Sequence, residues 1–372
     1  MRIAILAVVL LVGLSVGAAE PDPAKAFTAA KSAPVSHQID FRVVVTPPAG
    51  TKTLRVWVPV AQDDAGQTIT EGEWSVFPME VRPEFHTEKV FGNRFAYFEF
   101  ADPQGAQIIG HKFQATVWQL DWNVEPAKVE KIAKWPAAFD KFRRAESHIL
   151  IDDRVKKLAG VVTKDSPAGD LAAVMDWISA NMTYDHTVTS LVASTEHALT
   201  KKRGDCSDYH GLCSSLTRAL GMPTRVTYGL HLFPKNLPCH CKCEVYLHPY
   251  GWVSFDVSET QRLVKAIESA GALTATEKKE LVAAAVARLR RGFRDNTWLL
   301  MTRGTDYDLA PAASAKVPLV PTIHAEADGK PLPMPDPADP TKREFGWMTA
   351  HKYTANKSVP YPFKDWNTLK PR

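Results

Sequence analysis

The sequence predicts an α+β protein in which an antiparallel β region precedes a mixed region of helices and strands. Three observations support this prediction. Short apolar–polar alternations fill residues 36–122, the apolar period becomes helical from about residue 125, and strand-like runs return within residues 225–257.

The β region contains several short strands that are separated by turn formers. Pro47-Pro48-Ala49-Gly50 and Gly92-Asn93 are the clearest of these turns. Such a pattern is typical of an antiparallel sandwich, so we expect an N-terminal β-sandwich domain over residues 36–122. The apolar alternations are Ile39, Phe41, Val43 and Val45, then Leu54, Val56 and Val58, and later Phe113, Ala115 and Val117.

Helix signals dominate the region that follows, for which we expect a second domain over residues 125–310. Ser166 and Pro167 are a suitable N-cap and first residue for a helix that continues to Asn181. A helix after Cys206 ends at Gly221. Residues 261–292 are also expected to be helical, with a capping box formed by Thr274 and Glu277. The expected strands cover residues 225–232, 239–247 and 252–257.

The composition excludes some classes of partner. The chain has 372 residues, 45% of them hydrophobic, and a formal net charge of +4. The charge is small and no basic block is interleaved with aromatic residues, so we expect no nucleic-acid partner.

Residues 1–19 have the features of a secretory signal peptide. Arg2 precedes an apolar run over residues 3–12, and small residues end the segment. We expect cleavage near Ala18 or Ala19, no membrane span in the mature chain, and a secreted or periplasmic protein. An uncleaved anchor is the alternative.

The C-terminal extension over residues 311–372 combines prolines with aromatic residues. Seven prolines lie within residues 317–340. A disordered tail rarely carries so many aromatic rings, so we expect this extension to wrap over the folded body without regular structure. The aromatic residues are Phe345, Trp347, Tyr353, Tyr361, Phe363 and Trp366.

The strongest chemical signal is a cysteine, a histidine and an aspartate in that order. Cys206 follows Gly204 and Asp205 at an expected helix start, where the helix dipole favours a thiolate. His240 opens one strand and Asp256 closes the next. Nucleophile, base and orienting group are the parts of a thiol-dependent acyl-transfer site, and the Cys206 backbone N–H would bind the oxyanion.

This triad carries a geometric test, because side chains alternate along paired strands. His240 and Asp256 approach if they pair directly, or if Lys242 pairs with Asp256 so that His240 is diagonal, roughly 7–8 Å away at the backbone. A register that pairs Glu244 with Asp256 would separate them too far, unless a bulge intervenes.

Several short motifs occur in a fixed order within residues 165–260, and together they resemble the transglutaminase-like superfamily, in its exported bacterial form. The resemblance implies a papain-like core, in which the helix bearing Cys206 packs on an antiparallel sheet, with Cys206, His240 and Asp256 as catalytic residues. The motifs are Asp176-Trp177-Ile178 with Tyr184, Gly204-Asp205-Cys206-Ser207-Asp208-Tyr209, Arg218-Ala219-Leu220-Gly221-Met222-Pro223-Thr224-Arg225, His240, Glu244-Val245-Tyr246-Leu247, and Gly251-Trp252-Val253-Ser254-Phe255-Asp256.

One segment departs from the family pattern, in which a small residue and an aromatic residue commonly follow the histidine. Here Cys241-Lys242-Cys243 follow His240. Lys242 is expected on the same strand face as His240, where a cation would disfavour the imidazolium. We expect Gly204, Asp205, Lys242 and Trp252 at the substrate-binding site.

All five cysteines lie within residues 206–243. If Cys206 stays a free thiol, the other four allow three disulfide pairings, among which the sequence does not choose. Cys239, Cys241 and Cys243 alternate with His240 and point away from its face. A zinc or copper site on this strand is a less favoured alternative.

The sequence therefore predicts an exported enzyme that transfers acyl groups from peptide or other amide bonds through a Cys206 thioester. A cell-wall peptide is one candidate substrate. Hydrolysis is slightly favoured over cross-linking, because no feature of the sequence excludes water. No cofactor is expected, since no acidic loop has calcium-ligand spacing. The alternative is an inactive domain of this family that serves binding or scaffolding.

Overall fold

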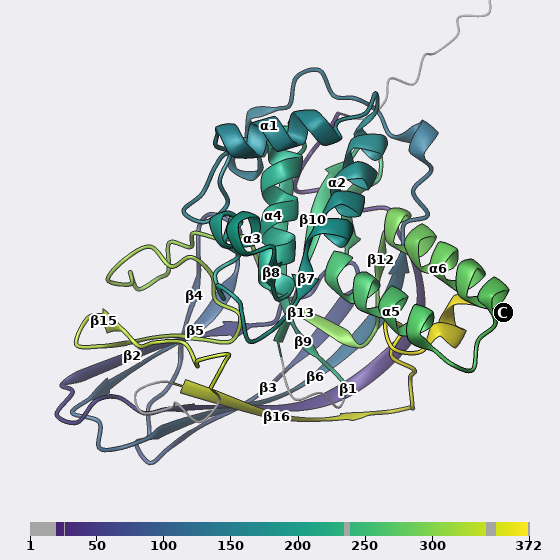
Figure 1. Ribbon diagram of the computed structural model, residues 1–372. Helices are drawn as coiled ribbons and strands as arrows, with labels where there is room; N and C mark the ends of the chain where they lie inside the picture. The colour runs from purple at the N-terminus through teal and green to yellow at the C-terminus, as the bar shows by residue number, and fades with distance from the viewer. Residues whose placement is uncertain (1–19, 26, 234–238, 340–346, 371–372) are drawn as a thin grey trace, which may run out of the picture.

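The computed structural model describes residues 20–25, 27–233, 239–339 and 347–370 (Figure 1). The predicted signal peptide, residues 1–19, lies outside this range. Among the helices of the described residues, none combines the length and apolar character that a bilayer span requires.

Two antiparallel sheets form a β-sandwich in the described chain (Figure 1). One sheet has the order β12-β6-β1-β16, with β3 also paired to β6, and the other has the order β15-β14-β2-β5-β4. The first sheet consists of β1 (Ala30–Val45), β3 (Gln67–Phe77), β6 (Gln107–Asp121), β12 (Phe293–Arg294) and β16 (Trp347–Ala355). The second consists of β2 (Thr53–Val60), β4 (Glu84–Thr87), β5 (Arg94–Ala101), β14 (His324–Ala327) and β15 (Lys330–Pro331).

The alternation seen in the sequence produces the core of this sandwich. On β1, Ile39, Phe41, Val43 and Val45 are buried while their polar neighbours point outward. They pack with inward residues of the other sheet, such as Phe98. Burying one face of each strand is the physical reason that a period of two specifies a half-buried sheet.

The second part of the molecule packs helices against the sheet β11-β10-β9-β13 (Figure 1). The α+β prediction is therefore confirmed. The strands are β9 (Thr224–His231), β10 (Cys239–Leu247), β11 (Gly251–Phe255) and β13 (Trp298–Arg303), and β7 (Thr183–Tyr184) pairs in parallel with β8 (Arg203–Gly204). The helices are α1 (Asp153–Val162), α2 (Pro167–Asn181), α3 (Thr195–Lys201), α4 (Cys206–Ala219), α5 (Val257–Ser269) and α6 (Ala275–Arg290), with short 3-10 turns η1 (Pro126–Lys128), η2 (Ala137–Phe142) and η3 (Trp366–Leu369).

Helix α4 is the central element of this part, with α1, α2 and α3 around it and β10 behind it (Figure 1). Its Leu212, Cys213 and Leu216 pack with Cys243 and Val245 of β10 in one apolar cluster. Burial on nearly all sides fixes the position of the helix start, and so that of Cys206.

The expected helix boundaries are largely observed. The Ser166 side chain accepts a hydrogen bond from Gly169 N, and Pro167 opens α2 as predicted. Thr274 and Glu277 form the predicted capping box at the start of α6. The segment expected to be helical over residues 261–292 is two helices, because α5 ends at Ser269 before that box begins α6.

The expectation that the C-terminal extension lacks regular structure is wrong. Strand β16 pairs with β1 over nine residue positions, and β14 pairs with β2. These strands cover edges of β1 and β2 whose backbone groups would otherwise have no partner in a sheet. The sandwich predicted for residues 36–122 therefore also contains strands from the far end of the chain.

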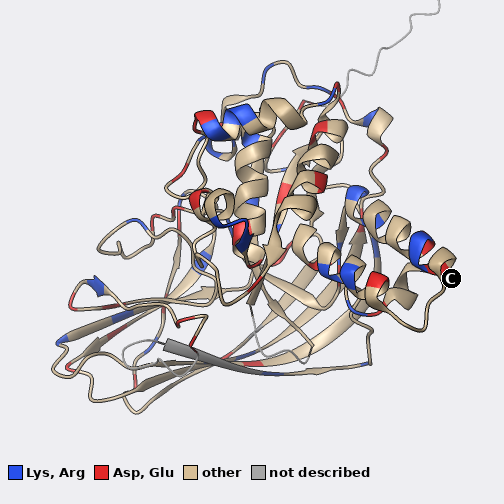
Figure 2. Ribbon diagram, in the orientation of Figure 1, with Lys and Arg blue, Asp and Glu red and all other residues tan. Residues whose placement is uncertain are grey.

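Charged residues of both signs are mixed over the helices. Figure 2 shows Lys and Arg beside Asp and Glu along α1 and α6. This mixture agrees with the small formal charge of the chain.

Candidate active site

Cys206 is the first residue of helix α4, and its position is fixed by a capped helix start. The Asp205 carboxylate accepts hydrogen bonds from Ser207 N at 2.8 Å and from Ser207 Oγ at 2.7 Å. His186 Nδ1 lies 3.4 Å from the other Asp205 oxygen. Asp205, expected at the substrate site, is thus the N-cap, which leaves the half-buried thiol at the positive end of the helix.

Gly204 lies in β8 directly before the cap, where the packing has no room for a side chain. A Cβ on Gly204 would lie 2.3 Å from Asp208 Oδ2. Asp208 itself is buried and accepts hydrogen bonds from Thr189 Oγ1 at 2.9 Å and Ser190 N at 3.1 Å. Glycine therefore allows the approach to α4 and the ordering of the loop around Thr189 and Ser190.

His240 and Asp256 meet through the diagonal register. Cys243 pairs with Phe255, which continues to Lys242 opposite Asp256. The His240 Nε2 atom lies 2.8 Å from Asp256 Oδ2, and both side chains are buried. Asp256 is also the N-cap of α5, since its Oδ1 accepts a hydrogen bond from Glu259 N at 3.1 Å.

The third contact joins His240 to Cys206, whose side chains are hydrogen-bonded. Trp298 Nε1 donates a hydrogen bond to the His240 carbonyl at 3.1 Å, which holds the strand backbone in place. The structure thus brings the three residues together, with His240 between Cys206 and Asp256.

Electrostatics favour a thiolate–imidazolium pair. A hydrogen bond from Cys241 and the charge of His240 outweigh burial and lower the pKa of Cys206 to about 6. Burial alone would lower the pKa of His240, but Asp256 and the Cys206 thiolate raise it to about 9. Between these values both groups are charged.

Lys242 lies on the same side of the strand as His240, as expected, but it is buried rather than open to substrate. Its Nζ atom is 2.7 Å from Asp256 Oδ2 and 3.0 Å from Asp295 Oδ2. The expected disfavouring of the imidazolium does not prevail, because Asp256 and Cys206 together raise the pKa of His240.

Trp252, also expected at the substrate site, lies near the other end of the hairpin. It pairs with Tyr246, six residues along β10 from His240, or roughly 20 Å at about 3.3 Å per residue. Its ring is buried against Phe142 and Tyr246, and its Nε1 donates to Pro23 O at 2.9 Å.

Two cysteines of β10, Cys241 and Cys243, contact helix α4. Cys243 Sγ lies 3.7 Å from Cys213 Sγ, and Cys241 Sγ lies 3.4 Å from His210 Nδ1. None of the five cysteines, all of which lie in the described part of the chain, forms a disulfide bond. Cys241 and Cys243 thus point to the helix side of β10, so they do not converge with the His240 ring on a single ion.

Two histidines near the triad were not assigned a role from the sequence. His210 Nε2 accepts a hydrogen bond from Val257 N at 3.2 Å, and burial lowers the pKa of His210 to about 4. His210 follows Cys206 by one helical turn, a spacing that could have indicated its place. The His231 ring stacks on His240 with centroids 4.7 Å apart, which only strand pairing could reveal.

One group has the spacing for a cation among the described residues. Ligand atoms of His231, His240 and Glu259 lie within 4.8 Å of one another. The His240 ring is already engaged by Asp256 and protonated over the neutral range, and a protonated ring is a poor ligand. We therefore assign no metal to this group.

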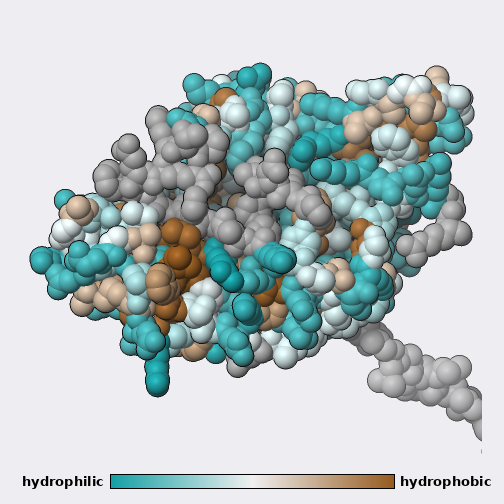
Figure 3. Space-filling view, turned by 90° about the horizontal axis from the view of Figure 1, so that it is seen from below, coloured by the Kyte–Doolittle hydropathy of each residue, from teal (hydrophilic) through white to brown (hydrophobic). Residues whose placement is uncertain are grey.

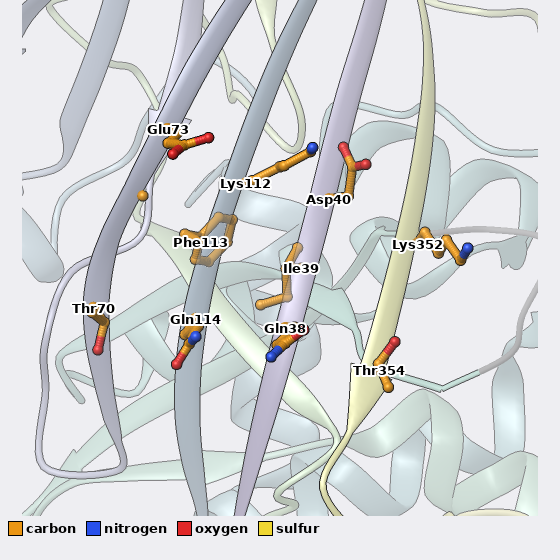
Figure 4. Close-up of a pocket in the computed structure, with 11 residues that line it drawn as sticks. Gln38, Ile39, Asp40, Thr70, Glu73, Lys112, Phe113, Gln114, Lys352 and Thr354 are labelled. Atoms are coloured by element: carbon orange, nitrogen blue, oxygen red, sulfur yellow. The ribbon is translucent and has the colours of Figure 1, made fainter.

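The sandwich also has surface hollows, away from the triad. One of about 430 Å³ lies on the outer face of β3, β6, β1 and β16, where Asp40, Glu73, Lys112 and Lys352 are among the labelled side chains (Figure 4). Another of about 420 Å³ is lined by Trp74, Phe85 and His111 among others. The sandwich side of the molecule carries an apolar patch among hydrophilic side chains (Figure 3).

The arrangement on α4, β10 and β11 coincides with a family match. Residues 156–257 match the model of the transglutaminase-like superfamily. These residues form a transglutaminase-like domain. The match contains Cys206, His240 and Asp256, and it extends from α1 to the start of α5.

Known proteins resemble larger parts of the chain. A solved structure from Cytophaga hutchinsonii, named provisionally as a cysteine protease, has a TM-score of 0.59 at 16% identity and covers 92% of this chain and 98% of its own. That likeness extends beyond the transglutaminase-like domain and shows a shared fold. A solved TGase has a TM-score of 0.24 at 15% identity, covering 46% of this chain and 43% of its own, which is too low to bear on function.

A sequence relative from Haemophilus influenzae is 25% identical over 227 residues. The aligned part covers 54% of this chain and 60% of the relative. The chain therefore spans less than two thirds of that protein, whose name states no function.

Proposed function

We propose that the protein is a cysteine-dependent acyltransferase that acts on peptide or other amide bonds. The observation that carries this proposal is the Cys206–His240–Asp256 constellation at the start of α4, in which His240 Nε2 lies 2.8 Å from Asp256 Oδ2. A free thiol beside an oriented histidine is the arrangement that nucleophilic catalysis requires.

The proposed reaction begins with attack of the Cys206 thiolate on the amide carbonyl carbon. The C–S bond forms, and the oxyanion accepts the Cys206 backbone N–H at the helix start. His240 then gives its proton to the leaving nitrogen as the C–N bond breaks. An amine departs and a thioester remains on Cys206.

In the second step the neutral His240 accepts a proton from water or from an amine, which attacks the thioester carbonyl. The C–S bond breaks and the Cys206 thiolate returns beside the imidazolium. Asp256 keeps the ring in place throughout and stabilises its charge. Water yields a carboxylic acid, and an amine yields a new amide.

Hydrolysis is favoured slightly over cross-linking, because Cys206 is partly exposed and thus open to water. We further propose that the protein acts outside the cytoplasm, as the charged start, apolar run and small residues of residues 1–19 indicate. Peptides of the cell wall and secreted proteins are candidate substrates there.

The test is to trap the acyl-thioester with a peptide-amide library on the wild type and on Cys206→Ala, and to locate the adduct by mass spectrometry. The proposal predicts an adduct on Cys206 of the wild type and none on the variant. Equal acylation of both would overturn it.

A second measurement separates the enzyme from an inactive binding domain. Iodoacetamide should label Cys206 in the folded, non-reduced protein faster than the four other thiols. A Cys206 that resists labelling would favour the binding domain.

A further inference from the structure

We propose that Lys242, held by Asp295, is a positioning residue of the triad. Its ammonium group shares Asp256 Oδ2 with His240 and thereby limits how firmly the carboxylate retains the imidazolium proton. This inference rests on the proposed function and deepens it. It concerns the residue at which the chain departs from the family pattern.

The geometry places two donors on one oxygen. Asp256 Oδ2 lies 2.8 Å from His240 Nε2 and 2.7 Å from Lys242 Nζ. The strand register aligns Lys242 with Asp256, with His240 one diagonal step away. A carboxylate oxygen that accepts from a lysine as well has less negative charge to offer the imidazolium.

Asp295 balances the buried lysine and keeps it in place. Its Oδ2 lies 3.0 Å from Lys242 Nζ, while its Oδ1 accepts hydrogen bonds from Thr297 N at 3.2 Å and Thr297 Oγ1 at 2.6 Å. A buried cation without such a counter-charge would be costly. Asp295 follows β12 and is far from Asp256 in sequence, so only the fold brings these two carboxylates to the same lysine.

Substrate does not reach the lysine. The Lys242 side chain is 1% exposed, and Nζ lies 5.3 Å from the Trp298 ring and 4.8 Å from the Phe363 ring. A direct contact with a substrate side chain is therefore excluded in this conformation. Its route to the chemistry is through Asp256.

His240 also has other polar neighbours, which the substitution of Lys242 leaves in place. The effect of Lys242 is therefore a difference in the His240 pKa between the wild type and the variant. Among the described residues, Asp256 is the only side chain that contacts both His240 and Lys242 at hydrogen-bond distance. The titratable groups that face the ring come from α4, β9, β10 and the start of α5, and they are Cys206, His210, His231, Lys242, Asp256 and Glu259.

The first experiment needs no substrate. NMR titration of the full chain, with histidine-selective isotope labels and His240→Asn to assign the signal, measures the His240 pKa directly. Lys242→Met should raise the His240 pKa by about one unit, because the cation that shares the Asp256 carboxylate with His240 is removed. Asp295→Asn should lower it, because Lys242 then acts on Asp256 without its counter-charge.

Matched variants separate positioning from stability. Lys242→Arg keeps the charge and should keep the wild-type titration. Arg225→Met removes another buried cation, which pairs with Glu244 at 2.7 Å on the same sheet and contacts neither His240 nor Asp256. It should lower the melting temperature and leave the His240 titration unchanged.

The second experiment compares two substrates that differ only in their leaving group. One is an amide and the other an activated ester, and both carry the acyl group that was trapped on Cys206. Amide cleavage needs the imidazolium proton and ester cleavage does not. Lys242→Met should therefore lower kcat for the amide about tenfold more than for the ester. The alkaline limb of the amide profile should move to higher pH.

Unchanged His240 titration in both Lys242→Met and Asp295→Asn would overturn the inference, and so would equal losses for amide and ester. If Lys242→Met does not fold, the Asp295→Asn shift decides alone. These outcomes are distinct from failure of the proposed function, which would appear as acylation that survives Cys206→Ala.

Discussion

At the scale of single residues, the site depends on charges that are placed where they stabilise one another. Cys206 has the helix start and His240, His240 has Asp256, and Asp256 has Lys242. Burial alone would raise the pKa of the Asp256 carboxyl, but Lys242 and His240 hold it well below its ordinary value. Each of these groups keeps its charge because a neighbouring group carries the opposite charge.

The pH dependence of acylation follows from this pairing. Activity should rise as the pH passes about 6, where the Cys206 thiolate forms, and fall above about 9, where His240 loses its proton. The rate of acyl-enzyme formation measured from pH 4 to 11 checks both limbs. A single limb near the ordinary thiol pKa would contradict an ion pair.

Substitution of Asp256, the proposed orienting residue, gives a second prediction at this scale. Asp256→Asn removes the charge that raises the pKa of His240 and the carboxylate that holds its ring. We expect the acylation rate at neutral pH to fall by about 10²- to 10⁴-fold. His240 should titrate at lower pH in the same variant. Retained activity with Asp256→Asn would show that the histidine does not need this partner.

At the scale of elements, the site depends on two capped helix starts and one hairpin. Asp205 caps α4 beside the thiol, and Asp256 caps α5 while it contacts His240. One carboxylate thus follows a strand, caps a helix and holds the His240 ring. The close packing of β8 on α4 fixes the first of these starts.

The packing at Gly204 can be tested by stability. Gly204→Ala places a Cβ 2.3 Å from Asp208 Oδ2, so we expect unfolding to become easier by about 1–3 kcal/mol. Gly160→Ala is the matched control, because it meets nothing within 4 Å and lies in α1. The control should stabilise by up to about 1 kcal/mol. Urea unfolding measures both, and an equal response would contradict the close approach.

At the scale of the whole molecule, the C-terminal extension joins the two parts of the structure. Strand β16 extends the sandwich through β1, and η3 packs near α6. Between them, the Tyr361 ring stacks on Phe233 with centroids 3.8 Å apart, and Phe363 lies over Lys242. The extension therefore covers the side of the triad on which Lys242 lies.

This role predicts a loss of stability when the covering ring is truncated. Phe363 is 4% exposed, so Phe363→Ala should destabilise the fold by about 3 kcal/mol. Phe77→Ala is the control, since that ring is 68% exposed and its loss should cost less than about 0.5 kcal/mol. Thermal unfolding compares the two, and equal melting temperatures would show that the extension is not packed.

The sequence by itself determined the fold class, the caps at Ser166 and Thr274, and the order of Cys206, His240 and Asp256. These features are local, because apolar periods, capping residues and motifs depend on neighbours along the chain. The same local rules left two registers of the β10–β11 hairpin in which His240 and Asp256 would approach each other.

Only the tertiary structure decided which register forms, where Lys242 finds its second carboxylate, and what the C-terminal extension does. Asp295 approaches Lys242, and β16 approaches β1, across long separations in sequence. The burial of Trp252 far from Cys206 has the same origin. Pairing at long range depends on which surfaces remain to be covered once the local elements exist, and a local pattern does not contain that information.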